Sequence, residues 1–70
     1  MQLEEYIADN MIELCEKRGI SKYRLAQMTG IAQSSLGRIM AKESLPSLPT
    51  LEKICKALDV TLSQFFCEGD

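Results

Sequence analysis

Two glycines and three hydroxyl side chains divide this chain into short segments of helical character. Gly19 and Gly30 each follow a stretch whose apolar residues recur at helical spacing, and glycine readily adopts the positive φ at which helices end. Ser21, Ser47 and Thr61 each precede such a stretch, where a hydroxyl oxygen can accept a hydrogen bond from a backbone N–H. These start and stop signals predict an all-α fold built from short helices.

Apolar periodicity between these signals predicts five helices and no strand. In the first, Ile7, Met11 and Cys15 share one face, with acidic residues at the start and basic residues at the end, as the helix dipole favours. The third places Leu36 and Ile39 inward and leaves a polar outer face that lacks acidic residues. The predicted helices are about residues 3–18, two turns after Ser21, about residues 33–40, a helix after Ser47, and a short last helix opened by the capping box of Thr61 and Gln64.

The length of the chain allows only one small core. A chain of 70 residues buries about 60% of the surface that it exposes when unfolded. Hydrophobic residues make up 46% of the chain and charged residues 26%, which argues against disorder. Apolar runs stay far below the roughly 20 residues that span a membrane, and the acidic N-terminus does not resemble a signal peptide. We therefore expect residues 1–70 to form a single cytoplasmic domain that contacts no membrane.

Cysteine and histidine usage argues against a metal site and against catalysis. The three cysteines include no C-x-x-C pair, and the chain has no histidine. Cys15 and Cys55 fall at apolar helix positions and are expected in the core, whereas Cys67 is a candidate exposed thiol. The chain has no phosphate-cradling glycine loop and no nucleophile with a base partner, so we expect neither an enzyme nor a cofactor or small-molecule ligand.

Charge is unevenly distributed along the chain. The formal net charge of -2 ordinarily counts against a nucleic-acid partner. The acidic residues of the first sixteen positions, which include no basic residue, are Glu4, Glu5, Asp9, Glu13 and Glu16. The basic residues of positions 17–42, which include no acidic residue, are Lys17, Arg18, Lys22, Arg24, Arg38 and Lys42. The middle of the chain is therefore positively charged despite the acidic total.

Residues 22–39 hold the residue types that a helix-turn-helix unit requires. Two helices that cross steeply over a tight turn need a small residue at their contact, which Ala26 supplies, and a glycine able to take positive φ, which Gly30 supplies. The apolar anchors that flank these positions are Leu25, Ile31, Leu36 and Ile39.

Together with the residues that follow it, this unit resembles the Cro/repressor (XRE-type) family of helix-turn-helix proteins. Pro46-Ser47-Leu48 and the apolar spacing from Leu51 to Leu62 are similar to the fourth and fifth helices of that family, so the likeness covers about residues 7–66. The resemblance implies a compact five-helix, lambda-repressor-like bundle with the helix-turn-helix at its second and third helices.

The resemblance also implies that the helix beginning near Gln33 lies in the major groove of double-stranded DNA. It implies base contacts by Gln33, Ser34 and Arg38, and backbone contacts by Lys22, Tyr23, Ser35 and Lys42. Glutamine can pair with adenine, and Arg38 can fork onto guanine O6 and N7 or reach a phosphate. Either serine can serve a base edge or a phosphate, and Tyr23 either touches the backbone or covers the edge of the core.

Three features depart from the family pattern. Ala32 precedes the third helix where the family favours serine or threonine, and a missing cap costs about 1 kcal/mol. Gly37 lies inside that helix at a similar cost relative to alanine. The loop after Met40 keeps only Lys42 where relatives often carry glycine and several basic residues, so we expect few phosphate contacts from it.

By this resemblance, the chain is expected to be a sequence-specific transcriptional regulator, acting as a repressor and binding DNA as a homodimer. The end of the chain is a candidate for the dimer surface, since one of Phe65 and Phe66 is surplus to so small a core unless both are buried. We expect a bacterial or phage-encoded protein that is nucleoid-associated when bound. The alternative, favoured by the acidic total and the depleted loop, is a protein-interaction module such as an antitoxin-like or adaptor domain.

Overall fold

The structure, a computed structural model, describes residues 2–66 and contains five helices within them. In chain order these are α1 (Leu3–Arg18), α2 (Lys22–Thr29), α3 (Gln33–Met40), α4 (Leu48–Ala57) and α5 (Leu62–Phe65). The described residues contain no strand, so the predicted all-α, five-helix fold is confirmed.

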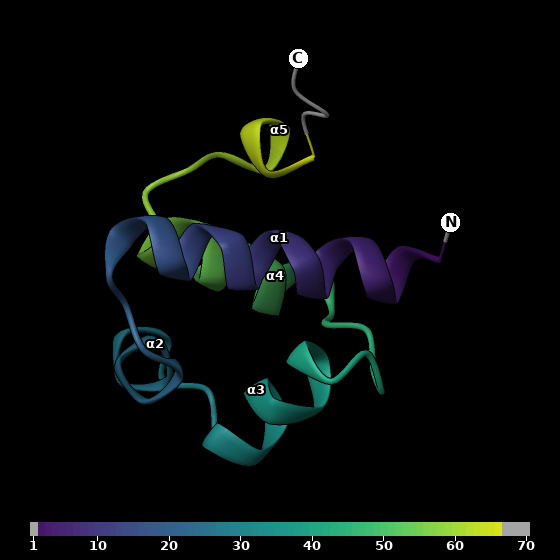
Figure 1. The fold of residues 1–70 in the computed structure, drawn as a ribbon, viewed down its shortest axis with the longest axis horizontal. Coiled ribbons are helices and arrows are strands. Elements are labelled where there is room, and N and C mark those ends of the chain that lie inside the picture. The colour runs from purple at the N-terminus through teal and green to yellow at the C-terminus, as the bar shows by residue number, and fades with distance from the viewer. Residues whose placement is uncertain (1, 67–70) are drawn as a thin grey trace.

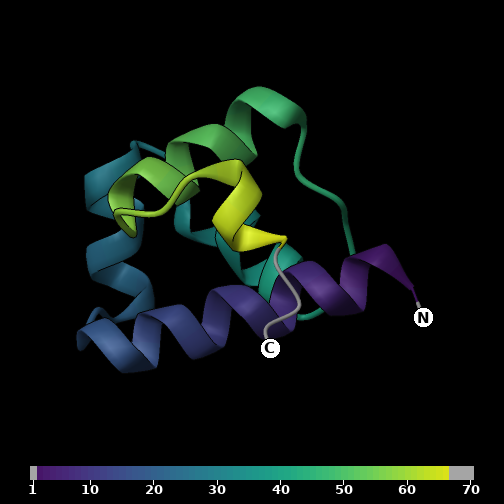
Figure 2. The same ribbon diagram turned by 90° about the horizontal axis from the view of Figure 1, so that it is seen from above.

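The helices are arranged around a central pair. α1 crosses the middle of the molecule with α4 behind it, while α5 lies on one side of this pair and α2 and α3 lie on the other (Figure 1). Seen from above, α1 and α4 lie on opposite sides and α5 covers the space between them (Figure 2). α3 packs on α1 and α2, and α2 also packs on α4. The helix-turn-helix pair therefore forms one end of the molecule, away from α5.

The helix ends follow the capping signals of the sequence. Gly19 ends α1 with a φ of 66°. The hydroxyls of Ser21 and Ser47 accept the backbone N–H three residues further on, at 3.1 and 3.4 Å. At α5 the Thr61 N–H donates to Gln64 Oε1 at 2.9 Å, and the Gln64 N–H donates to Thr61 Oγ1 at 3.0 Å. Each cap satisfies a helix-end amide that has no partner within the helix.

One apolar core joins all five helices. Each fully buried leucine, isoleucine or phenylalanine stabilises the fold by about 1.5 to 3 kcal/mol relative to an exposed side chain. Cys15 and Cys55 are buried in it as predicted, and the prediction for Cys67 lies outside the described residues. The core residues are Ile7, Met11, Cys15, Leu25, Ala26, Leu36, Ile39, Leu51, Ile54, Cys55, Leu58 and Phe65.

The short α5 is fixed to α1 as well as to α4. Asn10 donates from Nδ2 to the Phe65 carbonyl at 2.9 Å. The rings of Tyr6 and Phe66 stack with centroids 5.8 Å apart, and Phe66 meets Phe65 edge-on at 5.3 Å. Phe65 is 2% exposed, whereas Phe66 is 39% exposed. Only one of the two phenylalanines is therefore part of the core.

Candidate nucleic-acid interface

The turn between α2 and α3 is fixed by its own hydrogen bonds. Gly30 adopts a φ of 75° and donates its N–H to the Ala26 carbonyl at 2.9 Å. The Thr29 hydroxyl donates to the Leu25 carbonyl at 2.8 Å and accepts the Ile31 N–H at 3.2 Å. Because these bonds hold the three-residue connection, α3 keeps a set direction relative to α2.

α3 has one buried side and one exposed side. Leu36 and Ile39 are buried against the rest of the molecule. The exposed side chains of α3, all predicted as DNA contacts, are Gln33, Ser34, Ser35 and Arg38. Arg38 lies one turn beyond Ser34 and Ser35, so the structure brings these side chains to a common outer surface.

The N-terminus of α3 has no side-chain cap. Ala32 gives no side-chain cap, and the first hydrogen bond in this region runs from the Leu36 N–H to the Ala32 carbonyl at 3.0 Å. The amides of the three residues before Leu36 therefore have no partner within the helix. Such amides, at the positive end of a helix dipole, favour an anionic group such as a phosphate.

The N-terminus of α2 adds a cation and an aromatic ring beside α3. The Lys22 ammonium lies 3.9 Å from the position that a Cβ atom would occupy at Gly37. It lies 5.9 Å from the ring centroid of Tyr23, and Tyr23 itself is 62% exposed. The contact of Lys22 with α3 was missed by the sequence analysis, because it joins two helices across the turn.

Lys42, the predicted phosphate contact of the loop after α3, is held by carboxylates of α1. Its ammonium lies 3.7 Å from Glu5 Oε2 and 3.6 Å from Asp9 Oδ1. Lys42 also adopts a φ of 68°, a left-handed conformation that favours glycine. The spacing of Glu5 and Asp9, four residues apart on one helix, was the only sequence signal for this pairing.

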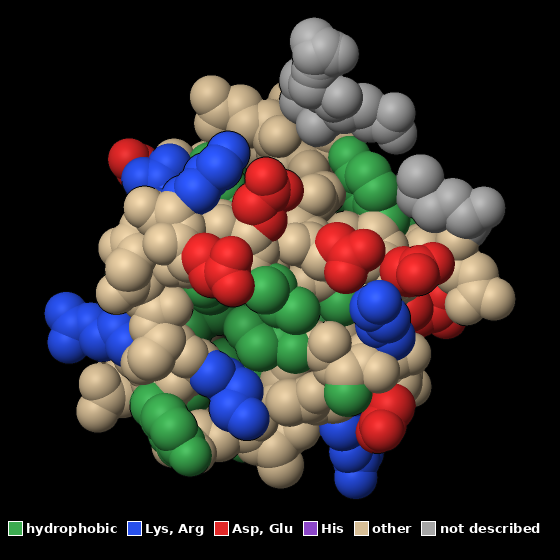
Figure 3. Space-filling model, in the orientation of Figure 1, with side chains coloured by type: hydrophobic (Ala, Val, Ile, Leu, Met, Phe, Trp, Pro, Cys, Tyr) green, Lys and Arg blue, Asp and Glu red, His purple; other side chains and the backbone are tan. Residues whose placement is uncertain are grey.

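The electrostatic surface follows from these placements. Figure 3 shows acidic side chains gathered along α1 and an apolar area beside them toward α2 and α3. Lysine and arginine side chains surround the lower part of this face, where α2 and α3 lie. The separation of charge along the chain is therefore kept only in part in space, because Lys17 and Arg18 lie on α1 and Lys42 lies against its carboxylates.

This geometry is matched by a known family. A sequence profile of the Cro/C1-type HTH DNA-binding domain matches residues 10–66, which include the whole of α2 to α5. The chain belongs to this family. Its membership confirms the predicted helix-turn-helix fold and DNA-binding class, and it places the chain among DNA-binding domains rather than enzymes.

Two regulators of Escherichia coli (strain K12) are similar in sequence to this Cro/C1-type chain. The HTH-type transcriptional regulator SutR is 38% identical over 63 residues, which are 90% of this chain and 35% of SutR. The HTH-type transcriptional regulator PuuR is 32% identical over 58 residues, which are 83% of this chain and 31% of PuuR. The chain thus spans about a third of the length of these relatives.

Two crystal structures share the fold of this Cro/C1-type chain. An HTH_3 family transcriptional regulator from Vibrio cholerae aligns with a TM-score of 0.84 at 38% identity, over 90% of this chain and 35% of that one. The restriction-modification controller protein C.AhdI from Aeromonas hydrophila aligns with a TM-score of 0.85 at 25% identity, over 90% of this chain and 96% of that one.

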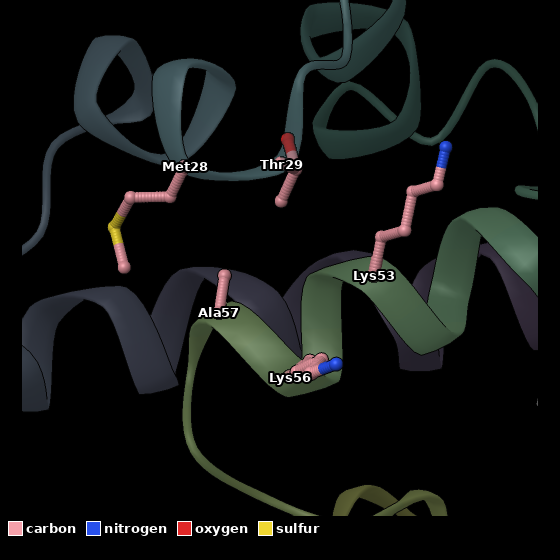
Figure 4. Close-up of a pocket in the computed structure, with 5 residues that line it drawn as sticks. All are labelled: Met28, Thr29, Lys53, Lys56 and Ala57. Atoms are coloured by element: carbon pink, nitrogen blue, oxygen red, sulfur yellow. The ribbon is translucent and has the colours of Figure 1, made fainter.

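A shallow groove between the end of α2 and α4 is a separate surface feature. Met28 and Ala57 face one another across it, and Lys53 and Lys56 stand along α4 (Figure 4). Thr29 completes the lining, which holds no carboxylate, histidine or cysteine for acid, base or nucleophilic chemistry. The groove therefore gives no evidence of a catalytic site.

The remaining reactive groups do not form a metal site. Within residues 2–66, no cluster of three histidine, cysteine, aspartate or glutamate side chains could hold a metal ion. Burial raises the pKa of the Cys15 thiol, and burial together with the carboxylate of Glu52 raises the pKa of the Cys55 thiol. Both thiols are therefore protonated and poorly nucleophilic at neutral pH.

None of the described helices has the length and apolar character needed to cross a membrane.

Proposed function

We propose that this chain is a sequence-specific DNA-binding transcriptional regulator, acting as a repressor, that inserts α3 into the major groove. The observation that carries the proposal is the outer face of α3, where Gln33, Ser34 and Arg38 are exposed together without an acidic neighbour on that helix. An α-helix fits the major groove, where each base pair presents a distinct pattern of donors and acceptors. The names of SutR and PuuR as transcriptional regulators support the regulatory role.

In this proposal the contacts divide into base readers and backbone contacts. Gln33, Ser34 and Arg38 face base edges, with Arg38 able to fork onto guanine O6 and N7. Tyr23, Ser35 and Lys42 approach phosphates at the margins of the groove. Lys22, the remaining predicted backbone contact, has its ammonium beside Gly37 of α3.

We propose that residues 1–70 act as one DNA-binding domain, with residues 22–39 as its helix-turn-helix, and that two copies bind together as a homodimer. The exposed Phe66, stacked on Tyr6, offers an aromatic surface at the end opposite α3. A two-fold dimer places its two recognition helices about one turn of DNA apart.

Selection of bound duplexes from a random pool tests this function. The native chain is expected to enrich a sequence with two related half-sites. Anisotropy titrations of the selected duplex with Arg38→Ala should then show that binding is weaker by about 1 to 3 kcal/mol and that the preference at one base position is relaxed. A uniform loss for all sequences would make Arg38 a phosphate contact, and failure to enrich any sequence would contradict the regulator.

A second candidate function is a protein-interaction module that uses the same fold. The acidic side chains of α1 and their pairing with Lys42 favour it, because they reduce the positive charge available to phosphates. DNA affinity separates the two functions. For the regulator, the logarithm of the DNA-binding constant falls linearly with the logarithm of the salt concentration, because phosphate contacts release counterions. An interaction module binds no duplex selectively.

A further inference from the structure

We propose that Lys22 and Gly37 form one base-reading unit, in which a lysine carried on α2 reads a guanine through the space left by a glycine on α3. This inference rests on the proposed function. It assigns Lys22 to a base edge, in place of the phosphate contact that its position at the start of α2 predicts.

Gly37 is half-buried on the side of the recognition helix that faces the start of α2. It follows Gln33 and Ser34 by one turn and so shares their side of α3, opposite the buried Leu36 and Ile39. A side chain at this position would point toward the DNA beside Arg38. Glycine leaves that part of the helix surface bare.

The Lys22 ammonium lies beside this bare part of α3. A Cβ atom built on Gly37 would meet Lys22 Nζ at 3.9 Å, and apart from its two chain neighbours and the backbone of its own helix no other described group comes within 4 Å of it. The space is therefore open except for one cationic head. Lys22 thus supplies from α2 the functional group that α3 lacks at its second turn.

The ammonium is also available to a ligand. Among the described residues, the lysines with a carboxylate within 4.0 Å are Lys17 and Lys42, and Lys22 is not one of them. Its nearest aromatic neighbour, Tyr23, lies at 5.9 Å, a distance at which a cation–π attraction orients the head without neutralising it. Lys22 therefore keeps its three N–H donors available for DNA.

The donor chemistry selects the base. An ammonium only donates, and guanine presents two acceptors, O6 and N7, in the major groove. Adenine presents N7 beside the N6 donor, thymine presents the single acceptor O4 beside its methyl group, and cytosine presents only a donor, so none of them offers two adjacent acceptors. A cationic head on the outer surface of a helix within the groove faces these base edges, whereas phosphates line the margins. The unit should therefore prefer a G·C pair.

Competition titrations against all four base pairs at each operator position test the unit. Lys22→Met removes the ammonium, and Gly37→Leu fills its space with a side chain that cannot bond to a base. Both variants should lose about tenfold or more of the preference for G·C at the same single position. The double variant should lose no more than either one, because the two changes remove the same contact. Gly37→Ala, whose methyl group meets Nζ only at ordinary contact distance, should lose less than Gly37→Leu.

Two controls keep the outcomes separate. Lys56→Met removes an equal charge from α4 and should leave the preference at every position unchanged. Thermal unfolding should show that the Gly37 variants are folded, since both residues favour a helix interior more than glycine does. Loss of affinity by one factor for every sequence in Lys22→Met would overturn the unit and make Lys22 a phosphate contact. Absence of any selected sequence for the native chain would instead contradict the proposed function.

Discussion

The ammonium of Lys42, just beyond the end of α3, lies 3.6 Å from the carboxylate of Asp9 on α1. Glu5, one turn earlier on α1, approaches the same ammonium at 3.7 Å. Two carboxylates thus share the one lysine of the loop that follows α3. They hold this loop on α1, and they compete with any phosphate for the charge of Lys42.

Removal of these carboxylates should strengthen DNA binding. In Glu5→Gln/Asp9→Asn, Lys42 is free to neutralise a phosphate, so the slope of log K against log salt should steepen by about 0.9 per subunit. Exposed ion pairs contribute at most about 1 kcal/mol, so the variant should remain folded. Fluorescence anisotropy at several salt concentrations measures the slope. Glu4→Gln/Glu16→Gln, an equal loss of two charges elsewhere on α1, should not change it, and an unchanged slope in Glu5→Gln/Asp9→Asn would show that Lys42 contacts no phosphate.

Ala32→Ser should stabilise the chain by supplying the missing cap of α3. Ala32 has the extended backbone of an N-cap residue, with φ -61° and ψ 143°, so a serine hydroxyl can reach the first-turn amides. The expected gain is about 1 kcal/mol, or roughly 4 to 8 °C in Tm for a domain of this size. Thermal unfolding measures it. Ser21→Ala, which removes an existing cap, should lower Tm by a similar amount, and a Tm unchanged by Ala32→Ser would show that the cap does not form.

Phe65 and Phe66 should differ sharply on truncation. Phe65→Ala leaves a cavity in the core and should cost about 3 to 5 kcal/mol, a large part of the total stability of a small domain. Phe66→Ala removes a half-exposed ring and its stack on Tyr6, worth about 0.5 to 1.5 kcal/mol beyond area burial. Circular dichroism should therefore show unfolding only for Phe65→Ala.

Phe66→Ala should weaken self-association, because the proposed dimer uses the aromatic surface of Phe66 and Tyr6. Sedimentation of native chain and Phe66→Ala over a range of concentrations measures it. The variant should remain monomeric at concentrations where the native chain dimerises. Equal dimerisation of both would place the dimer surface elsewhere.

The buried thiols should make stability fall at alkaline pH. Burial raises the pKa of Cys15 and Cys55 above the ordinary value of 9.0, so the folded chain holds these protons more tightly than the unfolded chain does. Their contribution is fully present below about pH 9 and is lost as the pH rises through the raised folded pKa. Urea unfolding at pH 7 and pH 10 should show a larger decrease for the native chain than for Cys15→Val/Cys55→Val. Equal decreases would assign the loss to other groups.

Local signals determined the elements of this fold. Gly19 and Gly30 end helices because glycine takes a positive φ without strain, and Ser21, Ser47 and Thr61 begin them because a hydroxyl binds a free amide. Each signal acts within a few residues, so it can be read from the sequence. The apolar spacing likewise predicted which side of α3 is exposed.

Contacts between helices were decided only by the tertiary structure. The pairing of Lys42 with Asp9 and the position of Lys22 beside Gly37 depend on how α1, α2 and α3 cross. The burial of Phe65 rather than Phe66 likewise depends on how α5 docks on α1 and α4. Such contacts join residues that are far apart in the chain or separated by a turn. Helical periodicity predicts only the direction of a side chain around the axis of its own helix, and not which other helix it meets. The sequence by itself therefore determined the helices and the exposed face of α3, and the packing of those helices decided which charges remain available to DNA.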